Sequence, residues 1–372
     1  MMDQFLLTSQ ARFEAARYLT NQPAGHRSSR LHGHGFLAQI RTAPPMDPAL
    51  RPGTEVATLQ TIWQNIVAPL DYRLLNDCLP QQPTDDNLAH WLLQQMPWTG
   101  IQRIRLHATP EQGMDVAPGQ NTLVWRRYRF ESAHQLPHVA PGHPCGRMHG
   151  HGFRVLIAAR HPDTPTKSNR IDYDDLDTLW QPIQTLLHHR CLNDIQGLEN
   201  PTSEVLSHWI WQQLHPVLPE LAWVTVMETS SSGAHYNGHN YRIWKEMTLD
   251  SAVRLSNVQE DDPRRRIHGH TFTLRLHLSA PLESIMGWIC DFGEVKKLFS
   301  PVFTMLDHHP LFEIPDLEDG DSLSIARWIA SQSRPLLPQL TRLDLTETPG
   351  CGIILALSKA QSGLIQLIKR IS

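Results

Sequence analysis

Residues 145–153 read Cys-Gly-Arg-Met-His-Gly-His-Gly-Phe, and the His-Gly-His triplet in this stretch occurs three times in the chain. The copies are His32-Gly33-His34, His149-Gly150-His151 and His268-Gly269-His270, and each is followed by one small residue and a phenylalanine. They lie about 118 residues apart, and chance does not explain a triplet that returns at a constant spacing. The sequence therefore predicts three tandem copies of one domain.

Every copy has the same predicted order of elements. A strand-like stretch precedes each triplet, at 13–17, 130–134 and 249–253, and an apolar or alternating segment follows it, as at 153–157. Helical spacing runs from Asp175 to Leu187, and Pro83-Thr84 and Pro201-Thr202 look like helix starts. The order strand, strand, helix, helix, strand, strand predicts an α+β fold in which two helices cover an antiparallel sheet. The expected units are residues 1–118, 119–243 and 244–372, and Trp209 and Trp328 are expected between helix and sheet.

Composition excludes several classes of protein. The formal net charge of −4 gives no general attraction to nucleic acid, so we expect no nucleic-acid partner. Five cysteines lie without paired spacing among 372 residues, which favours reduced thiols in a cytoplasmic protein. The N-terminal residues have no basic region and no sustained apolar run, so we expect neither secretion nor a membrane span.

Three histidines of the second unit form a candidate metal site. His149 and His151 are two residues apart on a predicted strand, so both side chains project from the same face. His134 lies on the preceding strand, and a hairpin would bring it beside this pair. Three imidazoles with an open fourth position are typical of a catalytic zinc. The alternative for any single copy is an ordinary surface or core histidine pair.

The first and third units do not complete this set. Arg17 and Val253 stand where the second unit has His134. A guanidinium repels a cation and valine has no lone pair, so we expect neither unit to hold zinc tightly. Their His-Gly-His pairs would then remain as strand-packing or hydrogen-bonding residues, with weak metal binding as the alternative.

The run from Cys145 to Phe153, with residues 130–134 before it and Glu228-Thr229 after it, resembles the 6-pyruvoyl-tetrahydropterin synthase family. The three residues between Cys145 and His149 resemble its bacterial branch, 6-carboxy-tetrahydropterin synthase. The resemblance implies the tunnelling fold, in which three four-stranded units close into a twelve-stranded barrel. Three fused copies would supply a pseudo-trimeric barrel from one chain, and two chains would form a homodimer equivalent to the family's stacked rings.

The resemblance also implies roles for individual residues. It assigns Zn²⁺ to His134, His149 and His151, the general base to Cys145, and the pterin anchor to Glu228. The family's Asp-His pair from a neighbouring subunit is kept only as Asp307-His308, because the other units have Asp71-Tyr72 and His188-His189. We expect Asp307 and His308 to complete the site of the second unit, and cationic neighbours to lower the pKa of Cys145. Ser28 and Arg264 replace Cys145, and Ala108 replaces Glu228, whereas Glu347 persists in the third unit.

Each of these assignments has a plainer alternative. Cys145 could be an inert small residue, Glu228 could form a salt bridge at a sheet end, and Asp307-His308 could cap a helix.

The implied activity is that of a zinc-dependent carbon-carbon lyase. Its substrate would be 7,8-dihydroneopterin triphosphate, and its products 6-carboxy-5,6,7,8-tetrahydropterin, acetaldehyde and triphosphate, a step toward queuosine. One alternative is a pyruvoyl-type pterin synthase, which uses the same site. Another is a non-catalytic pterin-binding or scaffold protein, which the two eroded units suggest.

Overall fold

The computed structural model describes residues 3–358 except 21, 23, 46–49, 51, 162–170 and 284–285. The first unit has strands β1 (Gln4–Arg17), β2 (His32–Thr42), β3 (Arg73–Leu74), β4 (Ile101–Thr109) and β5 (Gln112–Val116), with helices α1 (Glu55–Val67), α2 (Leu75–Cys78) and α3 (Asp85–Gln95). The second has β6 (Thr122–His134), β7 (His149–His161), β8 (Leu221–Thr229) and β9 (Ser232–Tyr236), with α4 (Tyr173–Leu187) and α5 (Ser203–Leu214). The third has β10 (Tyr241–Val253), β11 (His268–Leu278), β12 (Leu340–Thr348) and β13 (Cys351–Ala356), with α6 (Phe292–Leu306) and α7 (Ser322–Ser333).

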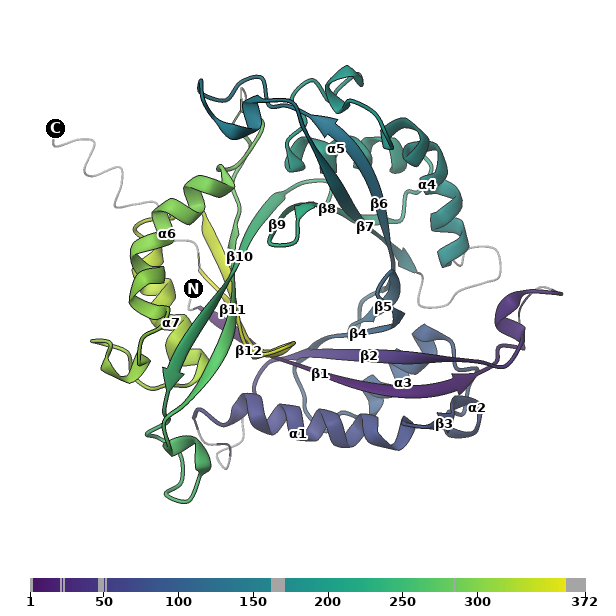
Figure 1. Cartoon of the computed structure of the whole chain (residues 1–372). Coiled ribbons are helices and arrows are strands. Elements are labelled where there is room, and N and C mark those ends of the chain that lie inside the picture. The colour runs from purple at the N-terminus through teal and green to yellow at the C-terminus, as the bar shows by residue number, and fades with distance from the viewer. Residues whose placement is uncertain are drawn as a thin grey trace.

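Twelve of these strands close into one antiparallel barrel. Within each unit the strands pair as neighbours, and the pairs β5–β6, β9–β10 and β13–β1 join one unit to the next. The helices lie outside this ring (Figure 1). Closure leaves no free edge on these strands, which explains why three four-stranded sheets are combined in one chain. The predicted architecture is confirmed.

Alternation along the strands separates the outer core from the barrel interior. Phe130 and Phe153 stack across β6 and β7 with ring centroids 5.0 Å apart, and Phe13 and Phe36 repeat this pair in the first unit at 4.9 Å. The outer face continues into buried helix residues, among them Trp209. The burial of Trp209 and Trp328 confirms their predicted place between helix and sheet.

Helices α3 and α5 begin where the sequence predicts. The hydroxyl of Thr202 caps α5 by accepting a hydrogen bond from the Val205 amide, and Thr84 caps α3 in the same way through Asn87. The expected boundary after residue 118 lies between β5 and β6, whereas the one after residue 243 lies inside β10. As folded, the third unit therefore begins with β10. No helix in the described part of the chain is long and apolar enough to cross a membrane.

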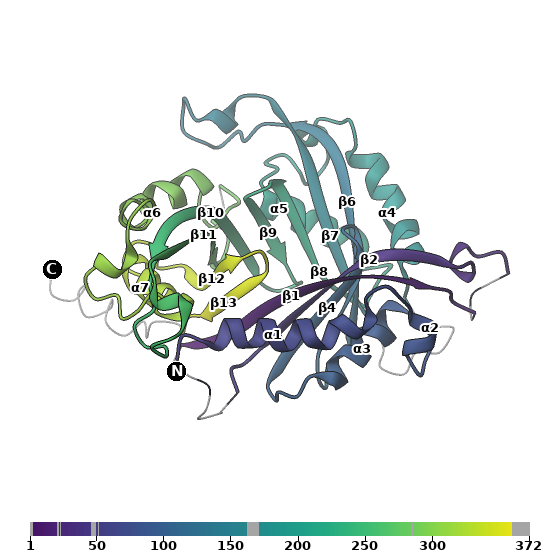
Figure 2. The ribbon, with the colours of Figure 1, turned by 60° about the horizontal axis from the view of Figure 1, so that its bottom comes forward.

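The first two strands of a unit are longer than its last two. In Figure 2 the β1–β2 and β6–β7 hairpins extend beyond the rest of the sheet. His32, His149 and His268 each begin the second strand of their hairpin, so all three triplets lie toward this projecting end of the barrel.

Candidate metal centre between the second and third units

Strand register brings the three predicted zinc ligands together. His134 pairs with His149 across β6 and β7, and Ser132 pairs with His151, so all three imidazoles project from one face. The ring centroid of His134 lies 4.5 Å from that of His149 and 5.2 Å from that of His151, and the His149 and His151 centroids are 4.9 Å apart. One ligand atom from each histidine and one from Glu228 all lie within 4.8 Å of one another. The β6–β7 hairpin places the three histidines, and the end of β8 places Glu228, as a metal site requires.

The hydrogen bonds of the histidines fit a bound cation. Nδ1 of His134 lies 3.2 Å from the Pro201 carbonyl, and Nδ1 of His149 lies 2.7 Å from the Arg147 carbonyl. An Nδ1 that donates to a carbonyl leaves the lone pair on Nε2, which is the usual arrangement behind a metal-binding imidazole. Nε2 of His134 and Nε2 of His151 are buried and have no hydrogen-bond partner among the described residues. Three imidazoles, two of them oriented in this way, suit zinc.

Glu228 lies beside the histidines at the end of β8. One of its carboxylate oxygens is 2.9 Å from Nε2 of His151 and 3.6 Å from Nε2 of His134. The other accepts a hydrogen bond of 3.2 Å from the Ser203 hydroxyl. Burial alone would raise the pKa of Glu228, but the two imidazoles close to its carboxylate lower that pKa well below the ordinary value.

A segment of the third unit forms one wall of this site. The Thr202 hydroxyl donates to the Gly287 carbonyl over 2.7 Å, and the Ile289 amide donates to the Glu204 carboxylate over 3.0 Å. Glu204 is only 2% exposed, and burial raises its pKa to about 7. This second buried carboxyl group beside Glu228 was not predicted as a site residue. Its only sequence signal was an acidic residue in the first turn of a helix, which is also typical of ordinary helix starts.

Cys145 lies in the loop between β6 and β7, in a short 3-10 helix, Pro144–Gly146. Its amide donates to Nδ1 of His143, and Nε2 of His143 lies 3.6 Å from a carboxylate oxygen of Asp291 in the third unit. Burial, followed by the negative charges of Glu228 and Asp291, raises the pKa of the Cys145 thiol. The expectation of a lowered pKa is therefore wrong for the metal-free chain, because the nearest charges are carboxylates.

The carboxylates near Cys145 predict how readily its thiol reacts with an alkylating reagent. Replacing Asp291 with asparagine keeps the oxygen that caps α6 through Gly293 and Glu294 but removes a negative charge near the thiol. In the metal-free protein we expect Asp291→Asn to lower the Cys145 pKa and to increase its alkylation rate at pH 8 about two- to threefold. Mass spectrometry of the peptide that contains Cys145 measures this rate. Asp194→Asn serves as the matched control, and equal rates for wild type and Asp291→Asn would contradict the assignment.

The structure does not bring Asp307 and His308 to Cys145 within one chain. Asp307 is the C-cap residue of α6, and it accepts hydrogen bonds from the Asp250 amide and from Nδ1 of His308. Asp291, which lies near His143 and the Cys145 loop, is at the opposite end of the same helix. Fifteen helical residues span about 22 Å. Asp307, His308 and Asp250 thus form a second, separate cluster.

An internal ion pair occupies the place of the metal site in the first unit. Arg17 pairs with His32 as His134 pairs with His149. Its guanidinium lies 2.7 Å from the Asp85 carboxylate, and both side chains are buried. Tyr173 of the second unit donates to the other carboxylate oxygen over 2.6 Å. Burial, followed by repulsion from Arg17, lowers the pKa of His34 to about 4, as expected next to a fixed cation.

The third unit keeps more of the site but lacks the third imidazole. Val253 is fully buried at the position of His134 and pairs with His268. Glu347 accepts a hydrogen bond from Ser322, as Glu228 does from Ser203, but it lies 4.0 Å from Nε2 of His270.

These differences predict the metal content of the chain. Purified protein should hold about one tightly bound zinc, because only the second unit has three imidazoles. Val253→His should raise this to about two zinc ions per chain, since position 253 lies opposite His268 as His134 lies opposite His149. Metal analysis after gel filtration measures the count, with Val253→Leu as the control. About three zinc ions in the wild type, or no gain in a folded Val253→His protein, would contradict the ligand assignment.

A closed barrel of repeated units with a three-histidine site at a unit boundary defines the class of tunnelling-fold proteins. Comparison with known families narrows this class. The family model described as 6-pyruvoyl tetrahydropterin synthase matches residues 6–118, 123–239 and 242–356, which is nearly the whole chain. The chain therefore belongs to the 6-pyruvoyl tetrahydropterin synthase family.

Individual relatives each match about one unit. The chain is 38% identical over 120 residues to the 6-carboxy-5,6,7,8-tetrahydropterin synthase of Synechocystis, which covers 31% of this chain and 92% of the relative. It is 35% identical over 117 residues to the dihydroneopterin monophosphate aldolase of Pyrococcus furiosus, covering 30% of this chain and 94% of the relative. The solved 6-pyruvoyl tetrahydropterin synthase of Caenorhabditis elegans is 23% identical, with a TM-score of 0.29, and covers 31% of this chain and 94% of that one.

Proposed function

We propose that the second unit carries a zinc-dependent lyase site that converts 7,8-dihydroneopterin triphosphate into 6-carboxy-5,6,7,8-tetrahydropterin, acetaldehyde and triphosphate, a step toward queuosine. The observation that carries this proposal is the convergence of His134, His149 and His151 within reach of Glu228. The named activity of the Synechocystis relative supports it.

The two carboxyl groups of the site are suited to the pterin ring. A pterin presents a ring N–H and an exocyclic amine on one edge, and a carboxylate accepts both hydrogen bonds side by side. Glu228 is ionised and lies next to the histidines, so it is the better acceptor. Glu204 lies deeper, and its raised pKa lets it keep a proton and donate to a ring oxygen or nitrogen.

We assign to Cys145 the role of taking a proton from the substrate side chain. A zinc ion held by the three imidazoles would act as a Lewis acid toward the substrate hydroxyl groups, and this makes the neighbouring carbon more acidic. The thiol must be a thiolate to accept that proton, and its raised pKa in the metal-free chain disfavours the thiolate. Cation binding next to Glu228 would reverse this electrostatic effect.

We propose that Asp307 and His308 serve a metal site on a second copy of the chain. Leu31, Met148 and Ile267 occupy the position just before each His-Gly-His triplet, and their side chains are 68%, 51% and 65% exposed. Three large apolar side chains at equivalent positions at one end of a barrel favour a contact with another ring. A homodimer of pseudo-trimers would cover them.

Complementation tests this arrangement. Cys145→Ala and Asp307→Asn should each be inactive alone, whereas unfolding and refolding the two variants together should restore activity. A mixed dimer holds one site with an intact Cys145 from one chain and an intact Asp307 from the other. A mixture that stays inactive, although sedimentation shows dimers, would favour a site completed within one chain.

Product analysis tests the activity itself. Zinc-loaded protein incubated with the pterin triphosphate should release acetaldehyde and triphosphate, and metal-stripped protein should release neither. A pyruvoyl-tetrahydropterin product would support the pyruvoyl-type alternative. Cleavage of dihydroneopterin monophosphate instead would place the chain with the Pyrococcus furiosus relative. Tight pterin binding without turnover would support the non-catalytic alternative.

A further inference from the structure

The inner face of the barrel carries an unusual number of arginines. Ile40 and Ile104 are fully buried under the helices, so their neighbours Arg41 and Arg103 project from the opposite face, toward the barrel interior. Arg105 on β4, Arg242 on β10 and Arg342 on β12 project inward by the same alternation, because their neighbours Leu106, Ile243 and Leu343 are fully buried in the outer core. This cluster lies outside the metal centre.

Strand register places like charges directly opposite one another. Arg41 pairs with Arg103 across β2 and β4. Arg242 pairs with His235 across β9 and β10, and Arg342 pairs with His277 across β11 and β12. Like charges at directly opposed positions destabilise a sheet. Arg41 and Arg103 form such a pair. Burial lowers the pKa of His235 to about 3 and that of His277 to about 4, so these two imidazoles are neutral near pH 7 and leave the charges of Arg242 and Arg342 unbalanced by their strand partners.

The carboxylates of the interior do not balance the arginines. Asp115 accepts hydrogen bonds from Arg103 and Arg105, and Asp344 accepts from Arg342 over 2.5 Å. Five guanidinium groups thus face two carboxylates in this cluster. Arg41 and Arg242 have no hydrogen bond or ion pair with any described residue, and Nε of Arg242 is buried without a partner. Two cations remain free to bind an anion.

The surroundings show the energetic cost of this charge. Burial, followed by repulsion from Arg103 and Arg342, lowers the pKa of Arg41 well below its ordinary value. Burial and the neighbouring arginines likewise lower the pKa of Arg242 to about 10. An anion held among these groups would relieve both the desolvation and the repulsion.

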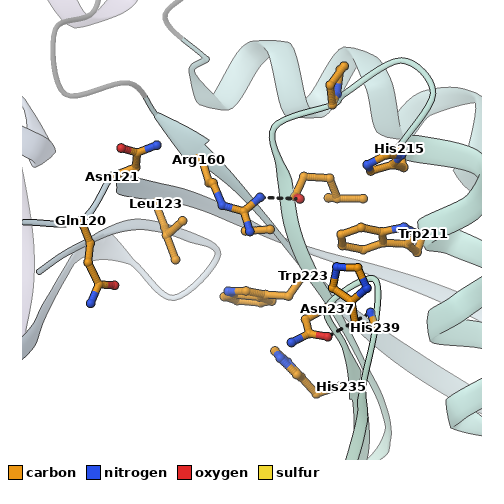
Figure 3. Close-up of a pocket in the computed structure, with 13 residues that line it drawn as sticks. Gln120, Asn121, Leu123, Arg160, Trp211, His215, Trp223, His235, Asn237 and His239 are labelled. Carbon is orange, nitrogen blue, oxygen red and sulfur yellow. Dashed lines mark hydrogen bonds between the residues drawn. The ribbon is translucent and has the colours of Figure 1, made fainter.

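A cavity adjoins this cluster, although none of the five arginines lines it. It has a volume of about 660 Å³ and is lined in part by Leu123, Arg160, Trp223 and His235 (Figure 3). His235 is the residue opposite Arg242. Leu221, which also lines the cavity, begins the strand that ends next to Glu228, so the cavity opens toward the end of the barrel away from the metal centre.

We propose that the barrel interior binds a phosphate-type oxyanion between Arg41, Arg242 and Arg342. Guanidinium groups match the geometry of phosphate oxygens, and several of them from different strands can contact one anion together. The site uses residues of the first and third units, which gives these units a role besides closing the barrel. The proposal does not depend on the function proposed for the metal centre.

Binding of inorganic phosphate and inorganic triphosphate to the full chain tests the proposal. Calorimetry on metal-stripped protein, at constant ionic strength set with chloride, should detect both anions. Arg242→Met and Arg41→Met should each weaken binding at least tenfold, whereas Arg73→Met, an exposed arginine on β3, should leave it unchanged. Metal-stripped protein is used so that anion binding to zinc does not contribute.

Thermal unfolding supplies a second measurement, which is informative even for variants that do not bind phosphate. In chloride buffer without phosphate, Arg242→Met should unfold at a higher temperature than wild type, because it removes a repulsive charge. Added phosphate should raise the unfolding temperature of the wild type but not of this variant. The proposal is overturned if phosphate stabilises wild type no more than chloride does, or if Arg242→Met keeps the wild-type affinity. Tighter binding of triphosphate than of phosphate would identify a polyphosphate as the ligand.

Discussion

Replacing Cys145 with alanine is expected to lower kcat for the pterin triphosphate by about 10²- to 10⁴-fold, the contribution of a positioned general base. The thiol lies in the loop that leads into His149, near Glu228 and Asp291. Alanine removes the proton acceptor but leaves the three imidazoles and the ring-binding carboxylates in place. KM and the zinc content should therefore change little. Steady-state kinetics on zinc-loaded protein measures both constants.

Two controls separate this effect from damage to the fold. Cys78→Ala removes a half-buried thiol of the first unit and should leave kcat unchanged. Cys145→Ser keeps the size of the side chain but has a much weaker acid, so it should be nearly as slow as alanine. A Cys145→Ala protein that retains more than a tenth of the wild-type kcat would show that another group accepts the proton.

Much of the fold can be predicted from the sequence because the pattern of one domain, with its His-Gly-His triplet, occurs three times. The period-two alternation around Phe130 and Phe153 and the threonines that precede α3 and α5 each determine local structure. The pairing of His134 with His149 then follows from a hairpin between neighbouring strands. These features depend on short stretches of chain, and such stretches are what a sequence reveals directly.

The rest of the site depends on contacts between units, which no local pattern specifies. In the sequence, Glu204 is an acidic residue at a helix start and nothing more. Its burial against Ile289 of the third unit is visible only in the assembled barrel. The pKa of Cys145 is raised, where the sequence predicts a lowered one, for the same reason: Asp291 approaches the thiol from the third unit. Asp307 does not complete the site within one chain, because the length of α6 separates it from the Cys145 loop.

The first unit is better understood as an altered site than as a lost one. In the first unit a guanidinium at position 17 supplies a positive charge where the second unit would bind a cation, and Asp85 stands where Ser203 lies. In the first unit the positive charge is therefore the Arg17 guanidinium, and its ion pair with Asp85 stabilises the unit boundary without a metal ion. Tyr173 extends this contact to the second unit.

Arg17→Met is therefore expected to destabilise the protein by about 3–5 kcal/mol at pH 7.5, because it leaves the buried Asp85 carboxylate without its cation. Burial raises the Asp85 pKa, but Arg17 holds the folded-state pKa below the ordinary value, so the pair stabilises the fold above the unfolded-state pKa and this stability is lost as pH falls. In Arg17→Met the main opposition to the burial effect is lost and the Tyr173 hydrogen bond remains, so the Asp85 pKa rises and the carboxyl group takes up a proton more readily as the pH falls. The loss of stability should accordingly be smaller at pH 5 than at pH 7.5. Urea unfolding at the two pH values measures it.

The double variant Arg17→Met/Asp85→Asn decides whether the charge or the shape of the side chains matters. It removes both charges while asparagine still accepts the hydrogen bond from Tyr173, so it should recover most of the stability lost in Arg17→Met. Equal destabilisation of the single and double variants would show that packing of Arg17 over Phe36, rather than the ion pair, stabilises this boundary. A single variant as stable as wild type would mean that water reaches Asp85 and that the first unit contains no charge-for-metal replacement.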